Sequence, residues 1–112
     1  MAHAIEVYWH HLNEGHYVAY QDLVIAARTH PELATVLKPA YQRFVKAWRR
    51  DALNLIPEWD GQREQFELIC DIGQYQMKGL AYGRLNGQLS DKKTRMVLDF
   101  TKDLLSKMAA EL

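Results

Sequence analysis

The sequence predicts an all-α fold, a bundle of five or six helices. Between a few glycines and prolines, the apolar residues recur every three or four positions, which is the period of a helix with one buried face. No stretch alternates strictly between apolar and polar residues, as a half-buried strand would. The 112 residues, 48% of them hydrophobic, suffice for one core, so we expect a single domain over residues 1–112.

Four helices are expected in the first half of the chain, over residues 2–13, 16–29, 32–37 and 39–56. Gly15 ends the first of them. Pro31 suits the first turn of the short helix, with Thr29 or His30 as its cap. Pro39 is acceptable at the start of the long helix, because a proline in the first turn gives up no hydrogen bond within the helix. Pro57 follows the end of that helix, and a turn is expected at Asp60-Gly61.

The last two helices carry more apolar surface than one small core can hide. The helix expected over 62–86 has two apolar stripes, one made of Phe66, Ile69, Cys70, Gly73, Met77, Leu80 and Ala81, the other of Leu68, Ile72, Tyr75, Gly79 and Tyr82. Such a helix must be covered on two sides. The final helix starts after a Ser90 cap and runs to the C-terminus, with Val97, Phe100, Leu104, Leu105, Met108 and Leu112 on its apolar face.

Three glycines lie inside the helix expected over 62–86, at Gly73, Gly79 and Gly83. Each costs about 1 kcal/mol relative to alanine in a helix interior. We expect another helix to approach closely there, because a missing side chain permits such an approach.

Composition and charge argue against several classes of protein. Fourteen basic residues balance fourteen acidic ones, whereas nucleic-acid-binding domains usually carry a basic excess. The basic group Arg43, Lys46, Arg49 and Arg50 is interpreted as a solvated helix face. The single cysteine, Cys70, excludes an intramolecular disulfide, and no apolar run is long enough to span a membrane. With no signal peptide visible either, we expect a cytoplasmic protein.

No catalytic motif is present, so we expect neither an enzyme nor a cofactor. The chain has no Gly-x-Ser-x-Gly sequence and no glycine-rich phosphate loop. A helical metal-binding bundle stays open as an alternative, since His3, His10 and His11 share the first helix and His16 follows it. Against a metal site, no histidine pair has the i, i+4 spacing and no Glu-x-x-His motif occurs.

The aromatic residues allow two interpretations. Most of them can be explained by core packing. Alternatively, they line a pocket between helices, in which tyrosine hydroxyls and a histidine make a few directed polar contacts within an apolar wall. The candidate ligand-binding residues are His16, Tyr20, Tyr41, Phe44, Trp48 and Tyr75.

The segment Ala26-Ala27-Arg28-Thr29-His30-Pro31-Glu32-Leu33 resembles a signature in the regulatory domain of many tetracycline-repressor (TetR) family transcription factors. His30 stands where the signature usually has aspartate. Upstream, Trp9, Gly15, Tyr20 and Leu23 resemble the preceding part of those domains, and Gly79-Leu80-Ala81 with Arg84-Leu85 resembles their penultimate helix. The resemblance covers nearly the whole chain, but the family's N-terminal helix-turn-helix domain is absent from it.

The resemblance implies a small-molecule-sensing and homodimerisation domain of a TetR-type regulator. In that family the last two helices pair with those of a second copy to form a four-helix bundle, and a small, often apolar effector binds among the other helices. DNA would be contacted only through the absent helix-turn-helix domain. The residues expected at the dimer interface are Gly79, Tyr82, Gly83, Val97, Phe100, Thr101 and Leu104. A protein interaction module without any ligand is a further alternative.

Overall fold

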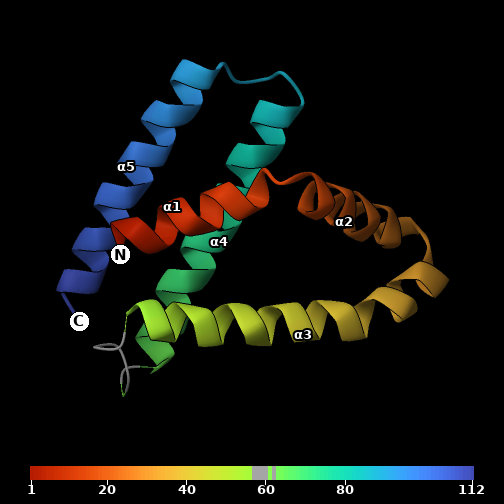
Figure 1. Ribbon diagram of the computed structural model, residues 1–112, viewed down its shortest axis with the longest axis horizontal. Coiled ribbons are helices and arrows are strands. Elements are labelled where there is room, and N and C mark those ends of the chain that lie inside the picture. Colours follow the sequence, from red (N-terminus) through yellow and green to blue (C-terminus); the bar gives the residue numbers. More distant parts are fainter. Residues whose placement is uncertain (57–60, 62) are drawn as a thin grey trace. The chain divides into compact units, whose positions relative to one another are not determined.

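The computed structural model describes residues 1–56, 61 and 63–112, and the all-α class is confirmed: these residues contain no strand. The elements in chain order are α1 (Ala2–Leu12), α2 (Gly15–Ala26), a 3-10 helix (Ala27–Thr29), α3 (Pro31–Leu55), α4 (Arg63–Leu85) and α5 (Asp91–Ala110) (Figure 1). Two compact units emerge, one of Met1–Leu12 with Glu58–Leu112 and one of Asn13–Pro57. The expectation of a single domain stays a prediction.

In the first unit, α4 and α5 form an antiparallel pair and α1 packs across both of them (Figure 1). The connection between α4 and α5 is short because the chain turns sharply at Gly87, whose φ of 74° few other residues adopt. The expected cap of α5 is confirmed: the Ser90 hydroxyl accepts a hydrogen bond from the Lys93 amide at 3.1 Å.

The contact between α4 and α5 is close, and two interactions fix its register. A Cβ atom added to Gly73 would lie 2.7 Å from the Leu105 Cδ1 atom, so the close approach of another helix is confirmed at this glycine. Three residues further along α4, the Gln76 amide donates a hydrogen bond of 2.6 Å to the Thr101 hydroxyl. Thr101 and its neighbour Leu98 are fully buried, so α5 turns these residues toward the core.

In the second unit, one expectation is wrong: no helix begins at Pro39. α3 runs unbroken from Pro31 to Leu55 with Pro39 in its interior. The proline removes the hydrogen bond that its own amide would donate to the Thr35 carbonyl and its ring crowds that carbonyl, while its fixed φ is compatible with a helix. The helix start at Pro31 is confirmed, and His30 occupies the cap position without a side-chain hydrogen bond.

The remaining helix ends agree with expectation to within about three residues, a common margin for assigned boundaries. Pro57, Asp60 and Gln62 lie outside the described residues. In the part of the chain that the structure describes, no helix is both long and apolar enough to cross a membrane.

Candidate functional site

The second apolar stripe of α4 is exposed. Leu68, Tyr75 and Tyr82 recur every seven residues and therefore share one side of the helix, and their exposed fractions are 59%, 63% and 56%. Gly79 lies between the two tyrosines, and a Cβ atom added to it would meet nothing within 4 Å. The first stripe is in contrast mostly buried, as Phe66 is, so the described residues of the first unit cover one apolar side of α4 and leave most of the other exposed.

A matching exposed stripe lies on α5. Phe100 and Leu104 are one helical turn apart, with exposed fractions of 69% and 39%. Arg95 and Lys102 point toward α1, because both contact the Glu6 carboxylate. Around the axis of α5, Phe100 and Leu104 are rotated by well over a quarter turn from Arg95 and Lys102. They therefore lie on the side of α5 that faces away from α1.

The two stripes lie on the same side of the α4–α5 pair. The Gly73–Leu105 and Gln76–Thr101 contacts show which sides of the helices face each other. In both helices, exposed residues come one position, about 100° of helical rotation, before contact residues: Tyr75 before Gln76, Phe100 before Thr101 and Leu104 before Leu105. Since the helices are antiparallel, these turns lead to one common side. We call the resulting surface the apolar face and define it by Leu68, Tyr75, Gly79, Tyr82, Phe100 and Leu104.

Four of the residues expected at a dimer interface belong to the apolar face: Gly79, Tyr82, Phe100 and Leu104. Val97 lies beside them and is half-buried. Gly83 and Thr101 point elsewhere. A Cβ atom added to Gly83 would lie 3.1 Å from the Leu89 side chain, and Thr101 is fully buried in its hydrogen bond with Gln76. Sequence spacing placed them near the face but could not separate an inward turn from an outward one.

The aromatic residues of the second unit partly cluster. The rings of Tyr17 and Phe44 have centroids 5.4 Å apart, and the Tyr20 ring lies 6.1 Å from the first and 6.2 Å from the second. The Tyr20 hydroxyl is buried with no hydrogen-bond partner among the described residues, and burial raises its pKa. The candidates Tyr41 and Trp48 are half-buried on α3, the helix that also carries Phe44.

The other two candidate ligand-binding residues are His16 and Tyr75. The His16 side chain is 80% exposed and its Nε2 atom lies 3.4 Å from a carboxylate oxygen of Glu14. Tyr75 belongs to the first unit and to the apolar face, where the Lys78 ammonium lies 5.5 Å from the centroid of its ring. Within the second unit, the structure therefore groups Tyr20 with Phe44, whereas His16 is exposed.

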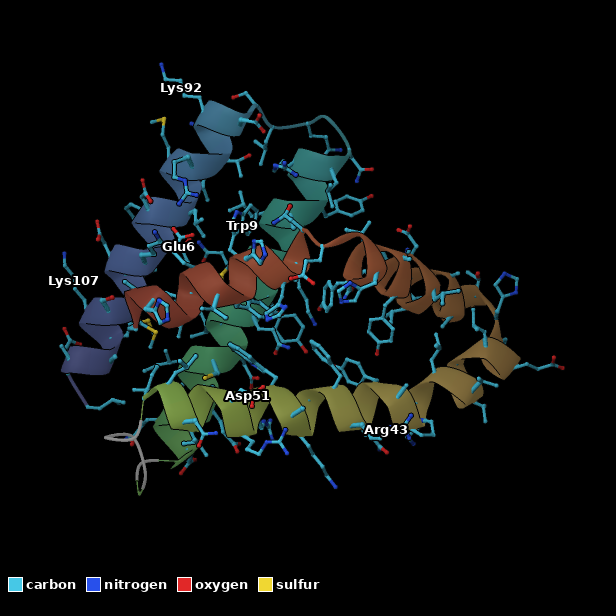
Figure 2. The ribbon with its side chains drawn as sticks, viewed as in Figure 1. Glu6, Trp9, Arg43, Asp51, Lys92 and Lys107 are labelled. Atoms are coloured by element: carbon cyan, nitrogen blue, oxygen red, sulfur yellow. The ribbon has the colours of Figure 1, made fainter. Side chains whose placement is uncertain are left out.

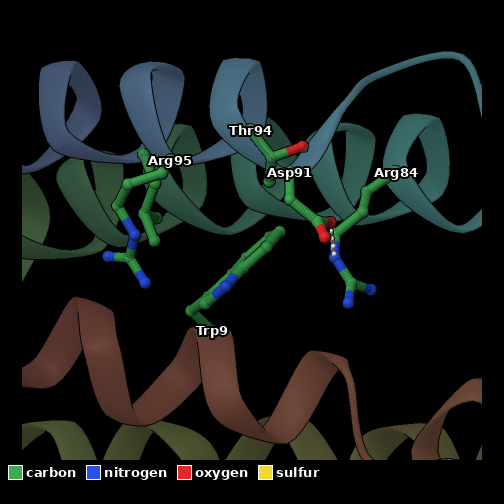
Figure 3. A pocket seen from close by; sticks show the side chains of 6 residues that line it. Trp9, Arg84, Asp91, Thr94 and Arg95 are labelled. Atoms are coloured by element: carbon green, nitrogen blue, oxygen red, sulfur yellow. Dashed lines mark ion pairs between the residues drawn. The ribbon is translucent and has the colours of Figure 1, made fainter.

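Sequence reasoning missed a pocket in the first unit, where α1 meets α4 and α5. The pocket has a volume of about 260 Å³ and is lined by Trp9, Arg84, Asp91, Thr94, Arg95 and Leu98 (Figure 3). The lining combines an indole ring, two guanidinium groups and one carboxylate. The sequence carried no signal for this combination, since Trp9 and Arg84 lie far apart in the chain and fit no motif.

An ion network beside the pocket ties α1 to α5. The Arg95 guanidinium donates a hydrogen bond of 2.6 Å to the Glu6 carboxylate, which also contacts the Lys102 ammonium. Figure 2 labels Glu6 and Trp9, which both belong to α1. Hydrogen bonds from Lys102 and then Arg95 lower the pKa of Glu6, because both stabilise the carboxylate form. At the far side of the pocket, the Arg84 Nε atom lies 3.4 Å from an Asp91 carboxylate oxygen.

Among the described residues, no three histidine, cysteine, aspartate or glutamate side chains come together in a way that could hold a metal ion. Comparison of the chain with protein-family models, with curated proteins and with solved structures finds no match. Membership of the TetR family stays a prediction from the sequence.

Proposed function

We propose that this chain is the small-molecule-sensing and homodimerisation domain of a TetR-type transcriptional regulator, and that it dimerises through the apolar face. The observation that carries the proposal is the breadth of that face, which extends over two helices. Monomeric proteins rarely expose contiguous apolar surface of this kind, and where it occurs it usually marks an interaction site.

A second copy of the chain is the occupant that the face fits best. Its defining residues carry no charge at neutral pH, so its partner surface must be apolar as well. The face also combines a projection with a recess. Phe100 is its most exposed ring, and Gly79 leaves open space between two tyrosines. In a two-fold symmetric pair, the projection of each copy meets the recess of the other, which makes the surface complementary to itself.

The sensing half of the proposal is supported by the resemblance and by the cluster of Tyr17, Tyr20 and Phe44. A buried hydroxyl with no partner, such as that of Tyr20, is costly unless a ligand supplies the missing hydrogen bond. The effector would be a small, mostly apolar molecule with one acceptor atom. Contact with DNA, and the operator sequence, would belong to a separate helix-turn-helix domain.

The mass of the chain in solution tests the dimer. Light scattering behind a sizing column, over a concentration series in the micromolar range, should give twice the chain mass of 13.1 kDa. The mass should fall toward that of one chain only on strong dilution. A single-chain mass throughout the series would contradict the proposal.

A further inference from the structure

The pocket between α1, α4 and α5 has the chemistry of a binding site. Figure 3 shows the Trp9 indole projecting from α1 toward the start of α5, with Arg95 on one side and Arg84 on the other. The ring offers a flat apolar surface, and the buried Leu98 side chain adds to it. One flat wall beside the Arg84 guanidinium suits a flat molecule that carries a negative charge.

The Arg84 guanidinium is the group of the lining that suits an anion. Arg95, the other guanidinium of the lining, is already held by the carboxylates of Glu6 and Asp99. Asp91 and Thr94 also belong to the first turn of α5, where the helix dipole contributes partial positive charge. The Arg84 Nε atom lies 3.4 Å from an Asp91 carboxylate oxygen, and the two side chains are 37% and 91% exposed. Ion pairs at the surface are weak in water, so a ligand carboxylate can compete with Asp91 for Arg84.

We propose that this pocket binds a small aromatic carboxylate, whose ring lies against Trp9 and whose carboxylate pairs with Arg84. Guanidinium and carboxylate groups match in shape and form two parallel hydrogen bonds. The volume of about 260 Å³ lies just under the range of drug-sized pockets, about 300 to 1,000 Å³, which limits the ligand to one or two rings. The site is separate from the residues expected from the sequence to bind an effector.

The test uses 1-naphthoate as the probe and the three tryptophan indole N–H signals in a ¹H–¹⁵N correlation spectrum as the readout. The Trp9 signal is identified by its loss in Trp9→Phe. Naphthoate should shift this signal saturably, whereas uncharged 1-naphthamide, of nearly the same shape, should bind about tenfold more weakly. A charge-assisted hydrogen bond is worth about 1.5 to 3 kcal/mol, and 1.4 kcal/mol corresponds to tenfold in affinity. Equal binding of the amide would overturn the proposal.

Variants of the pocket then test whether the naphthoate carboxylate pairs with Arg84. Arg84→Gln should weaken naphthoate binding about tenfold or more, and Asp91→Asn should tighten it several-fold because the competing carboxylate is gone. Arg43→Gln removes an exposed arginine of α3 and should change nothing (Figure 2). Unchanged affinity in both Arg84→Gln and Asp91→Asn would overturn the proposal, as would a shift confined to the other two indole signals.

The pocket is independent of the proposed dimer and can be tested without it. Its α5 residues Asp91, Thr94 and Leu98 lie away from the exposed stripe of Phe100 and Leu104. The naphthoate titration repeated on Phe100→Glu should therefore give the wild-type affinity, whatever the mass of that variant. Loss of binding in Phe100→Glu, with its helical content intact by circular dichroism, would contradict a site confined to α1, α4 and α5.

Discussion

Two tyrosines three residues apart on α2 differ in what their hydroxyl groups contact. The Tyr17 hydroxyl accepts a hydrogen bond of 2.7 Å from the Gln21 amide, whereas the Tyr20 hydroxyl is buried with no partner. Leaving a buried polar group without a hydrogen bond costs about 1 to 3 kcal/mol. Comparing the two residues therefore tests whether the Tyr20 hydroxyl stabilises the fold or is available to hydrogen-bond a ligand.

Tyr20→Phe should raise the free energy of unfolding by about 1 kcal/mol, because it removes the unpaired hydroxyl and keeps the ring. Tyr17→Phe should lower it by about 1 kcal/mol, because it breaks a hydrogen bond. Urea unfolding followed by circular dichroism measures both. A loss of stability in Tyr20→Phe would show that its hydroxyl is paired, and would remove the basis for an effector contact there.

The glycines of α4 allow a second comparison at the residue scale. A Cβ atom at Gly73 would press on the buried Leu105 side chain, whereas one at Gly79 would meet nothing. Gly73→Ala should lower the free energy of unfolding, since overpacking of about 1 to 3 kcal/mol exceeds the gain in helix propensity. Gly79→Ala should raise it by about 0.5 to 1 kcal/mol.

Both glycine variants are best measured by urea unfolding in the Phe100→Glu background, where any effect of Gly79→Ala on dimerisation is absent. The expected order of stability is Gly79→Ala, then the background, then Gly73→Ala. If Gly73→Ala were the more stable of the two alanine variants, the close α4–α5 contact described above would be wrong.

At the scale of elements, Glu6 links α1 to α5 through Arg95 and Lys102. The pKa of Glu6 is lowered from 4.5 in the folded chain. A carboxyl group with a lowered folded pKa stabilises the fold above its unfolded pKa and loses that contribution as the pH falls through the folded pKa. The contribution is modest, because the side chain is 39% exposed and water screens the pairs.

Glu6→Gln should therefore reduce the free energy of unfolding at pH 7, and the difference from wild type should vanish as the pH falls below 4.5. Asp103→Asn, which removes an exposed carboxylate from α5, serves as the control and should show little change. Urea unfolding from pH 3 to pH 7 measures both. A Glu6→Gln deficit that persisted unchanged at pH 3 would contradict the ion network.

The elements were largely predictable from the sequence, because helical periodicity and capping are local. Ser90 and Pro31 mark helix starts through chemistry that depends on the next three or four residues. The prediction that a helix starts at Pro39 was wrong because it rested on a local rule alone. In the structure, Pro39 lies in the interior of the long helix α3, which continues despite the missing hydrogen bond. The link from Glu6 to Arg95 spans 89 positions, and no local rule predicts it.

At the scale of the whole molecule, the sequence predicts the surplus of apolar surface, but it does not predict which apolar residues face outward. Two apolar stripes on one helix required two covering surfaces, and the part of the chain that the structure describes leaves most of the second stripe exposed. Which residues turn outward depended on the register set by Gly73 and Gln76, which the sequence alone does not give. Hence Phe100 lies on the apolar face, while its neighbour Thr101 is buried.

The central claim is that two copies of the chain pair through the apolar face. Phe100→Glu places a charge at its most exposed ring, and Val36→Glu makes the same change on α3 at a residue of similar exposure, 72% against 69%. Neither change should unfold the chain, and circular dichroism checks this. By light scattering, wild type and Val36→Glu should have twice the mass of one chain and Phe100→Glu the mass of one chain. A dimeric Phe100→Glu, or a monomeric wild type, would contradict the account.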